Sequence, residues 1–157
     1  MELRIIPKGS GKYVVNDPKE RTIYTVTKAK KLFGNPITTL HDASGYALYT
    51  MQRTASGKKP AFDVFFNEST FMKISCKSIY VDPCVTFETE KMKYELKGSD
   101  DYKDFQIVVN RQKVGEMHTE RQANNEPMYQ LSIDDAYFVD FIPLFAVAAD
   151  KCFSKIK

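Results

Sequence analysis

Few residues in this chain are suited to acid–base chemistry. There are two histidines, His41 and His118, and each has carboxylates near it in the sequence: Asp42 beside the first, Glu116 and Glu120 near the second. A neighbouring carboxylate can tune an imidazole for proton transfer. However, a histidine at a strand end more often faces solvent or makes a hydrogen bond, and turn chemistry accounts for Asp42. We therefore predict no catalytic residue, and we keep a small enzyme with a polar pocket using His41 or His118 as an alternative.

Nucleophile, cofactor and metal patterns are equally sparse. Gly9-Ser10-Gly11 lacks the rest of a hydrolase, P-loop or dinucleotide motif, so it predicts a turn. Cys76, Cys84 and Cys152 are an odd number of cysteines without the close pairing that zinc sites use. They are expected to be free thiols, with Cys152 in the core. The sequence thus predicts neither a metal nor a cofactor.

Basic clusters are the feature with the clearest binding potential. They lie near the ends of neighbouring predicted hairpins, so they could share one rim of a barrel and attract anionic headgroups. Lysines at such positions also serve as a plain solvated rim that discourages aggregation, and that alternative stays open. The candidate lipid- or anion-binding residues are Lys28, Lys30, Lys31, Arg53, Lys58 and Lys59.

Composition and charge exclude several classes of protein. The chain has 157 residues, 43% hydrophobic and 27% charged, which excludes disordered and low-complexity classes. A net charge of +3 is too mild to indicate a nucleic-acid partner. No segment approaches the roughly 20 apolar residues that span a bilayer, and no secretory leader is recognisable. We expect a cytoplasmic protein that is soluble or peripheral at a membrane surface.

Alternating apolar and polar residues, separated by turn signals, dominate the first four fifths of the chain. A spacing of about 8 to 12 residues between such segments is typical of an antiparallel sandwich or barrel. The predicted strands are 13–15, 22–27, 37–40, 46–51, 62–66, 71–76, 85–87, 92–96, 105–109, 114–117 and 129–133.

The last fifth predicts a helix over about 140–153. Asp140 is available as N-cap, Pro143 suits a first turn, and several alanines favour helix. The segment is apolar on all sides, which is typical of a helix enclosed by protein; a short membrane-inserting tail is the less favoured alternative. No linker composition divides the chain, so residues 1–157 are predicted to be one domain with a sheet wrapped around this helix.

Taken in order, these segments resemble the tubby C-terminal-like superfamily, and in particular the LURP-one-related family, which is similar in fold to phospholipid scramblases. The resemblance covers nearly the whole chain. It rests on Tyr13–Asp17, Ile23–Val26, Ile37–Gly45, Leu48–Met51, Tyr94–Gly98, Phe105–Ile107, Val114–Met117, Tyr129–Ile133 and the apolar segment ending at Asp150.

The resemblance implies a closed antiparallel barrel of about twelve strands around a hydrophobic C-terminal helix. It also implies a non-enzymatic binding or scaffold domain, whose expected partner is an anionic phospholipid or membrane surface, with unknown protein partners. A pure protein–protein interaction module is the alternative. No phosphoinositide-binding motif matches residue by residue, and neither the transmembrane tail of scramblases nor the separate N-terminal region of tubby proteins is recognised here.

Overall fold

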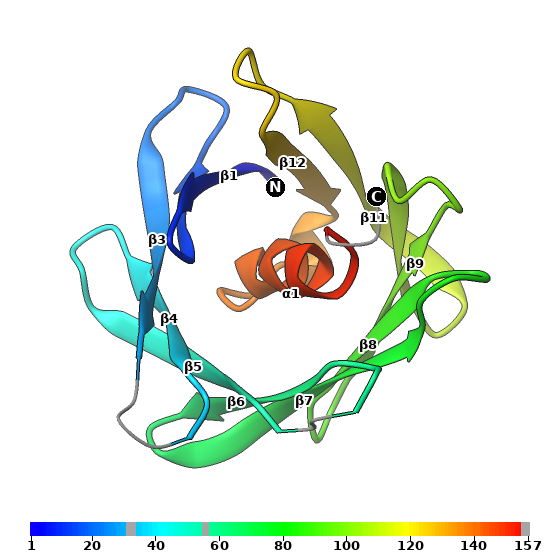
Figure 1. Ribbon diagram of the computed structural model, residues 1–157, viewed down its shortest axis with the longest axis horizontal. Coiled ribbons are helices and arrows are strands. Elements are labelled where there is room, and N and C mark those ends of the chain that lie inside the picture. The colour runs from blue at the N-terminus through cyan, green and yellow to red at the C-terminus, as the bar shows by residue number, and fades with distance from the viewer. Residues whose placement is uncertain (31–33, 55–56, 155–157) are drawn as a thin grey trace.

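The computed structural model describes residues 1–30, 34–54 and 57–154, and shows twelve antiparallel strands closed into a barrel around one helix (Figure 1). Each strand pairs with its sequence neighbours, and β1 pairs with β12 to close the ring. The strands are β1 Glu2–Gly9, β2 Lys12–Asn16, β3 Thr22–Ala29, β4 Ile37–Asp42, β5 Ala47–Arg53, β6 Ala61–Phe66, β7 Ser69–Ser78, β8 Cys84–Glu88, β9 Lys93–Gly98, β10 Asp104–Val109, β11 Gln112–Arg121 and β12 Pro127–Ile133.

Alternation along each strand explains the closed ring. In β3, Tyr24 and Val26 are buried while their neighbours Thr25 and Thr27 are only half-buried. Successive strand side chains point to opposite faces, so every strand sends one apolar row inward. Tight turns join the strands: Asn67 adopts φ 49° and the residue after it φ 68°, the left-handed conformations that two-residue hairpins require. The predicted mainly β barrel is confirmed.

β1 was absent from the strands predicted by alternation. It contains Pro7, and a proline within an apolar run argues against a strand because it cannot donate a backbone hydrogen bond. Nevertheless Leu3 and Ile5 are buried, and β1 pairs with both β12 and β2. Gly9-Ser10-Gly11 is the turn between β1 and β2, as predicted, with positive φ at all three residues.

The helix α1, Pro143–Phe153, runs through the barrel interior (Figure 1). Every residue from Pro143 to Ala149 is buried, as are Cys152 and Phe153, so the predicted enclosure is confirmed. Its start differs from the prediction. The N-cap position is Ile142, whereas Asp140 lies before the helix and accepts a hydrogen bond from the Tyr24 hydroxyl at 2.5 Å. A short 3-10 helix, Asp135–Tyr137, lies between β12 and this segment.

The direction of α1 defines two ends of the barrel. At its start, Phe141 packs against Tyr49 and Tyr94, which lie near the first residues of β5 and β9. At its finish, Phe153 stacks on Phe105, at the beginning of β10. We call the end where α1 finishes the mouth. The hairpin loops β1–β2, β3–β4, β5–β6, β7–β8, β9–β10 and β11–β12 lie at the mouth.

Candidate functional site

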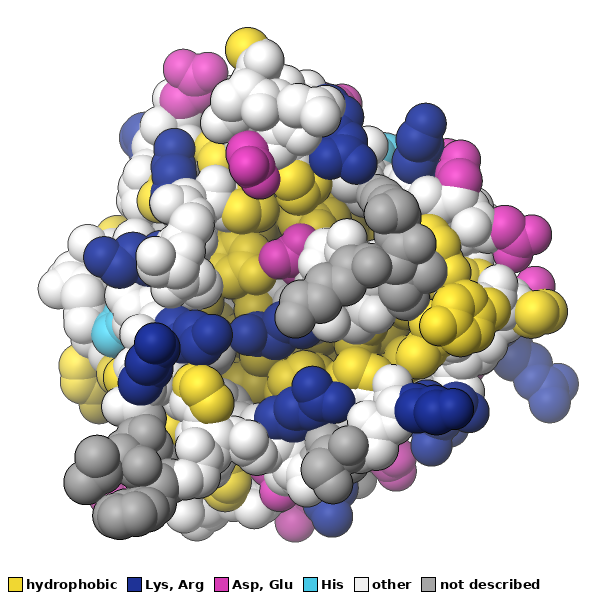
Figure 2. Space-filling model, viewed as in Figure 1, with side chains coloured by type: hydrophobic (Ala, Val, Ile, Leu, Met, Phe, Trp, Pro, Cys, Tyr) yellow, Lys and Arg dark blue, Asp and Glu magenta, His cyan; other side chains and the backbone are white. Residues whose placement is uncertain are grey.

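Three adjacent hairpin loops make one side of the mouth basic. They cover residues 8–12, 28–36 and 53–60, and their sequences contain Lys and Arg but neither Asp nor Glu. Figure 2 shows Lys and Arg side chains gathered along one side of the opening, around a hollow with a hydrophobic floor. The cations of these loops that the structure describes are Lys8, Lys12, Lys28, Lys30, Arg53, Lys58 and Lys59.

Strand register turns two of these cations toward the opening. In β3 the buried row is Tyr24 and Val26, so the next residue of that row is Lys28. In β5 the buried row is Tyr49 and Met51, so the next is Arg53. Because the side-chain period of a strand is two, each inward row ends in a cation where the barrel meets water.

Lys28 and Arg53 line a cavity of about 500 Å³ between α1 and the ends of β3 to β6. We call it the basic cavity. Lys151, in the last turn of α1, contributes a third cation, a position that the helix dipole favours. The remaining lining residues are Gly11, Asn35, Pro36, Thr38, Met51, Phe62, Asp150 and Ser154.

Hydrogen bonds hold the rim of the basic cavity in place. The Asn35 side chain donates to the Arg53 carbonyl at 2.8 Å, and the Gln52 side chain donates to the Asn35 carbonyl at 3.0 Å. The Arg53 guanidinium donates to the Gly57 carbonyl at 3.2 Å. The described parts of the β3–β4 and β5–β6 loops are therefore linked to each other through Asn35 and Arg53.

Gly11 makes room for Lys28. A Cβ at Gly11 would lie 2.5 Å from Cδ of Lys28, and the residue has φ +75°. Only glycine adopts this conformation readily while leaving space for a crossing side chain. The turn that the sequence predicted at residues 9–11 thus also positions a cation of the cavity.

Asp150 is the carboxylate of the basic cavity, and two tyrosines hold it. The hydroxyls of Tyr13 and Tyr129 each donate to one of its oxygens at 2.5 Å. Burial, reinforced by the negative charge of Asp150, raises the pKa of both phenols. Both tyrosines therefore remain protonated donors, and they stabilise a negative charge that the C-terminal end of a helix otherwise disfavours.

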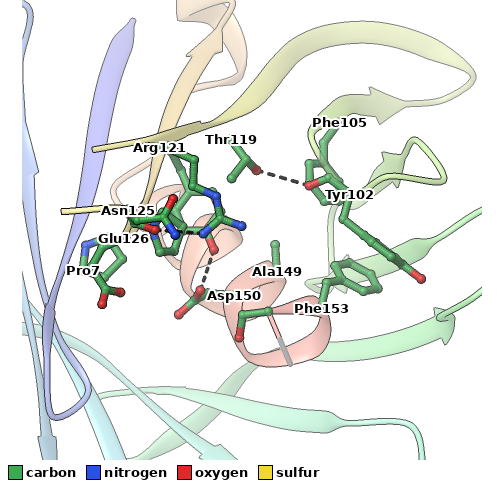
Figure 3. A pocket seen from close by; sticks show the side chains of 13 residues that line it. Pro7, Tyr102, Phe105, Thr119, Arg121, Asn125, Glu126, Ala149, Asp150 and Phe153 are labelled. Carbon is green, nitrogen blue, oxygen red and sulfur yellow. Dashed lines mark hydrogen bonds between the residues drawn. The ribbon is translucent and has the colours of Figure 1, made fainter. Parts of the chain in front are cut away.

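A second cavity of about 450 Å³ opens on the other side of the α1 terminus (Figure 3). Its wall combines aromatic rings, including Tyr102, Phe105 and Phe153, with the charged side chains of Arg121, Glu126 and Asp150. Arg121 donates to the Asn125 carbonyl at 3.1 Å. Asp150 lines both cavities, so the end of α1 lies between this mixed cavity and the basic one.

The three cysteines are free, as predicted, and Cys152 is buried in the core. The neighbouring Cys76 thiol on β7, together with burial, raises the pKa of Cys152. Burial also raises the pKa of Cys84. Within the described ranges, no cluster of three or more His, Cys, Asp or Glu side chains could hold a metal ion.

The predicted anion-binding residues that the structure describes lie at the same end of the barrel. Lys28 and Arg53 reach the basic cavity, Lys30 follows β3, and Lys58 and Lys59 lie in the β5–β6 loop. Lys31 lies outside the described residues. Sequence reasoning missed Lys151, Arg121 and Asp150. Extending the inward row of β11 from Met117 through Thr119 would have found Arg121; no local signal joins Asp150 to Tyr13 and Tyr129.

Both histidines lie on strands. His41, on β4, contacts the Thr27 hydroxyl at 3.0 Å. His118, on β11, lies on the outer wall beside a depression of about 320 Å³. Its Nδ1 is 2.6 Å from Asp104 and its Nε2 is 3.6 Å from Glu116. The hydrogen bond with Asp104 raises the pKa of His118, which favours the protonated ring.

No helix in the described part of the chain is long and apolar enough to cross a membrane.

Comparison with solved structures gives an Arabidopsis thaliana protein of known X-ray structure. It is 14% identical, with a TM-score of 0.50, and the match covers 94% of this chain and 86% of that one. At this identity the likeness concerns the fold alone. No curated protein matches the chain. The family model described as LURP-one-related matches residues 1–150, which include the barrel and most of α1. The chain therefore belongs to the LURP-one-related family and is a tubby-like barrel domain.

Proposed function

We propose that this domain is a non-enzymatic binding module that docks an anionic group, such as the phosphate of a phospholipid headgroup, in the basic cavity at the mouth. The observation that carries the proposal is the convergence of Lys28, Arg53 and Lys151 on one cavity of about 500 Å³. Several cations around a concave site focus an electric field and raise the local concentration of anions.

The surroundings favour an anion over other ligands. The loops that form this side of the mouth contain no acidic residue. Among the described residues of the cavity wall the one carboxylate is that of Asp150, and it already accepts two hydrogen bonds from tyrosines. Apolar side chains such as Met51 and Phe62 form part of the same wall. A phosphate attached to an organic group can thus meet both cationic and apolar surface.

A soluble probe tests the cavity separately from any membrane. Inositol trisphosphate, titrated calorimetrically, is expected to bind at low ionic strength and to bind more weakly as salt is added. Changing both Lys28→Glu and Arg53→Glu is expected to lower the affinity by at least about tenfold. The matched control is Lys91→Glu with Lys93→Glu, which makes the same change of charge at the opposite end.

Two results would contradict the proposal. If the mouth variant binds inositol trisphosphate as well as the unchanged protein does, the basic cavity is not the site. If the control variant loses as much affinity as the mouth variant, binding depends on overall charge alone. The rival interpretation, a protein-interaction module, is favoured if neither the unchanged protein nor the variants bind the probe.

A further inference from the structure

The most exposed large hydrophobic residues that the structure describes are neighbours in one loop. Tyr80 is 72% exposed and Val81 is 74% exposed. Both lie between β7 and β8, in a loop at the mouth. Single exposed apolar residues are common on protein surfaces. Two adjacent ones at the tip of a loop, beside a basic surface, indicate a site of interaction.

The framework holds this loop in a fixed position. The Tyr102 hydroxyl donates to the Ile79 carbonyl at 2.9 Å, and the Gly98 amide donates to the Pro83 carbonyl at 2.8 Å. The Ser78 hydroxyl closes the loop on the carbonyl of Val81. Tyr80 and Val81 are therefore presented at the tip without having to be ordered by a partner.

Cations stand directly beside the loop. The Lys59 ammonium donates to the carbonyl of Lys77 at 3.2 Å, and the Cys76 amide donates to the carbonyl of Pro60 at 3.0 Å. The β5–β6 loop, with Lys58 and Lys59, is thus bound to the strand that leads to Tyr80. An exposed aromatic and aliphatic tip flanked by lysines is complementary to an interface that is apolar inside and anionic at its surface.

Acidic residues lie on the other flank of the loop. They are Asp82 in the loop itself and Asp100 and Asp101 in the β9–β10 loop. Asp101 is engaged locally, accepting from the Ser99 hydroxyl at 2.6 Å and from the Lys103 amide at 3.1 Å. The charge asymmetry around Tyr80 therefore favours a tilt that brings the lysine side, not the β9–β10 side, toward an anionic surface.

We propose that the domain docks on an anionic lipid bilayer mouth-first, with Tyr80 and Val81 inserted at the headgroup level and Lys58, Lys59 and Lys77 against the headgroups. This orientation rests on the proposed function, because it places the basic cavity over the same surface. Tyrosine suits this depth because its ring is apolar and its hydroxyl is polar.

The absence of tryptophan from the sequence provides a clean optical test. Tyr80→Trp creates the sole tryptophan of the chain, and Tyr46→Trp is its matched control, since Tyr46 is 67% exposed at the opposite end. With phosphatidylcholine vesicles that contain phosphatidylserine, the Tyr80→Trp emission is expected to shift to shorter wavelength, while the Tyr46→Trp emission stays unchanged. A shift for Tyr46→Trp, or bound protein with no shift for Tyr80→Trp, overturns the orientation.

Vesicle sedimentation supplies the affinity. Tyr80→Ser combined with Val81→Ser is expected to lower the partition coefficient by about tenfold, and Tyr46→Ser to leave it unchanged. Changing Lys58→Glu and Lys59→Glu is expected to lower it by about fivefold per residue, with Lys91→Glu and Lys93→Glu as the control. Vesicles of phosphatidylcholine alone should bind much more weakly. Equal binding by the Tyr80 and Val81 variant contradicts the proposal.

The two proposals fail separately. If inositol trisphosphate binds in the basic cavity but vesicles do not retain the protein, docking is wrong and the proposed function stands. If vesicle binding depends on Tyr80 and Val81 but the soluble probe does not bind, the docking surface stands and the cavity is not an anion site. Urea denaturation of each variant confirms that these exposed substitutions leave the fold intact.

Discussion

The two ends of the barrel contain hollows of similar size but opposite charge. The basic cavity at the mouth has about 500 Å³ and holds Lys28, Arg53 and Lys151. At the opposite end a depression of about 510 Å³ has Asp42 and Asp140 as the charged residues of its described lining. In β3 the inward row continues from Val26 to Lys28 at the mouth. In β4 it continues from Leu40 to Asp42 at the opposite end. Charge at the strand ends, more than cavity size, therefore distinguishes the ends.

Each end also uses an aspartate to hold tyrosine hydroxyls. Asp150 accepts from Tyr13 and Tyr129 at the mouth, and Asp140 accepts from Tyr24 at the opposite end. Their surroundings differ: Asp150 lies between two cavities, whereas Asp140 adjoins Phe141 and its dense aromatic contacts. We infer that aromatic packing contributes more to stability at the opposite end, and that the mouth contributes more to binding.

The largest expected difference concerns two phenylalanines: Phe141, just before α1, and Phe153, the last residue of α1. Phe141→Ala should lower the free energy of unfolding by about 4–5 kcal/mol, and Phe153→Ala by about 3 kcal/mol. Both rings are buried, but Phe153 packs against two aromatic rings and borders a cavity, whereas Phe141 packs against four rings, so fewer contacts are lost at Phe153. Urea denaturation measures both. Equal losses would remove the proposed difference in packing. The rings around Phe141 are Tyr49, Phe71, Tyr94 and Phe145.

The aspartates should show the reverse order. Asp150→Asn is expected to lower the free energy of unfolding by about 2–3 kcal/mol, because two charge-assisted hydrogen bonds are lost. Asp140→Asn is expected to lower it by about 1 kcal/mol, because only one is lost. A double-mutant cycle controls the assignment: in a Tyr13→Phe background, Asp150→Asn should cost less than in the unchanged protein. The same cost in both backgrounds would show that the Tyr13 contact contributes nothing.

Two turn glycines provide a smaller test. Gly11, at the mouth, and Gly45, at the opposite end, have φ of +75° and +87°, but only Gly11 has a neighbouring side chain, Lys28, where a Cβ would lie. Each change to alanine should lower the free energy of unfolding by about 1 kcal/mol, because alanine is strained at a positive φ. Gly11→Ala alone should also weaken inositol trisphosphate binding by displacing Lys28. Weakening by Gly45→Ala as well would argue against a local site.

The smallest expected effect concerns the outer wall. The hydrogen bond with Asp104 raises the pKa of His118 above its usual 6.5. The pair is therefore stabilising at pH below about 6.5, and this stability is lost as the pH rises through the folded-state pKa. Since His118 is 47% exposed, His118→Gln should lower the free energy of unfolding by only about 0.2–0.5 kcal/mol at acidic pH. At alkaline pH it should leave the free energy of unfolding unchanged. If this variant binds inositol trisphosphate with altered affinity, His118 has a role in binding.

Most of the barrel was predictable from local patterns, because alternation and turn residues are short-range signals. The strand ending at Val26 and the turn at Gly11 are examples. β1 was missed because Pro7 interrupts its pattern, and its place depends on pairing with β12 at the far end of the chain. The N-cap prediction at Asp140 was wrong because a distant tyrosine, Tyr24, takes up that carboxylate instead.

The sequence by itself determined the strand-rich fold, the buried helix and a set of cations at hairpin ends, since these follow from periodicity, composition and spacing. Only the tertiary structure decided that Lys28, Arg53 and Lys151 surround one cavity and that Tyr13 and Tyr129 meet on Asp150. It alone placed Tyr80 and Val81 beside the lysines. The physical reason is closure: pairing β1 with β12 closes the barrel around α1 and brings together residues that no local interaction connects.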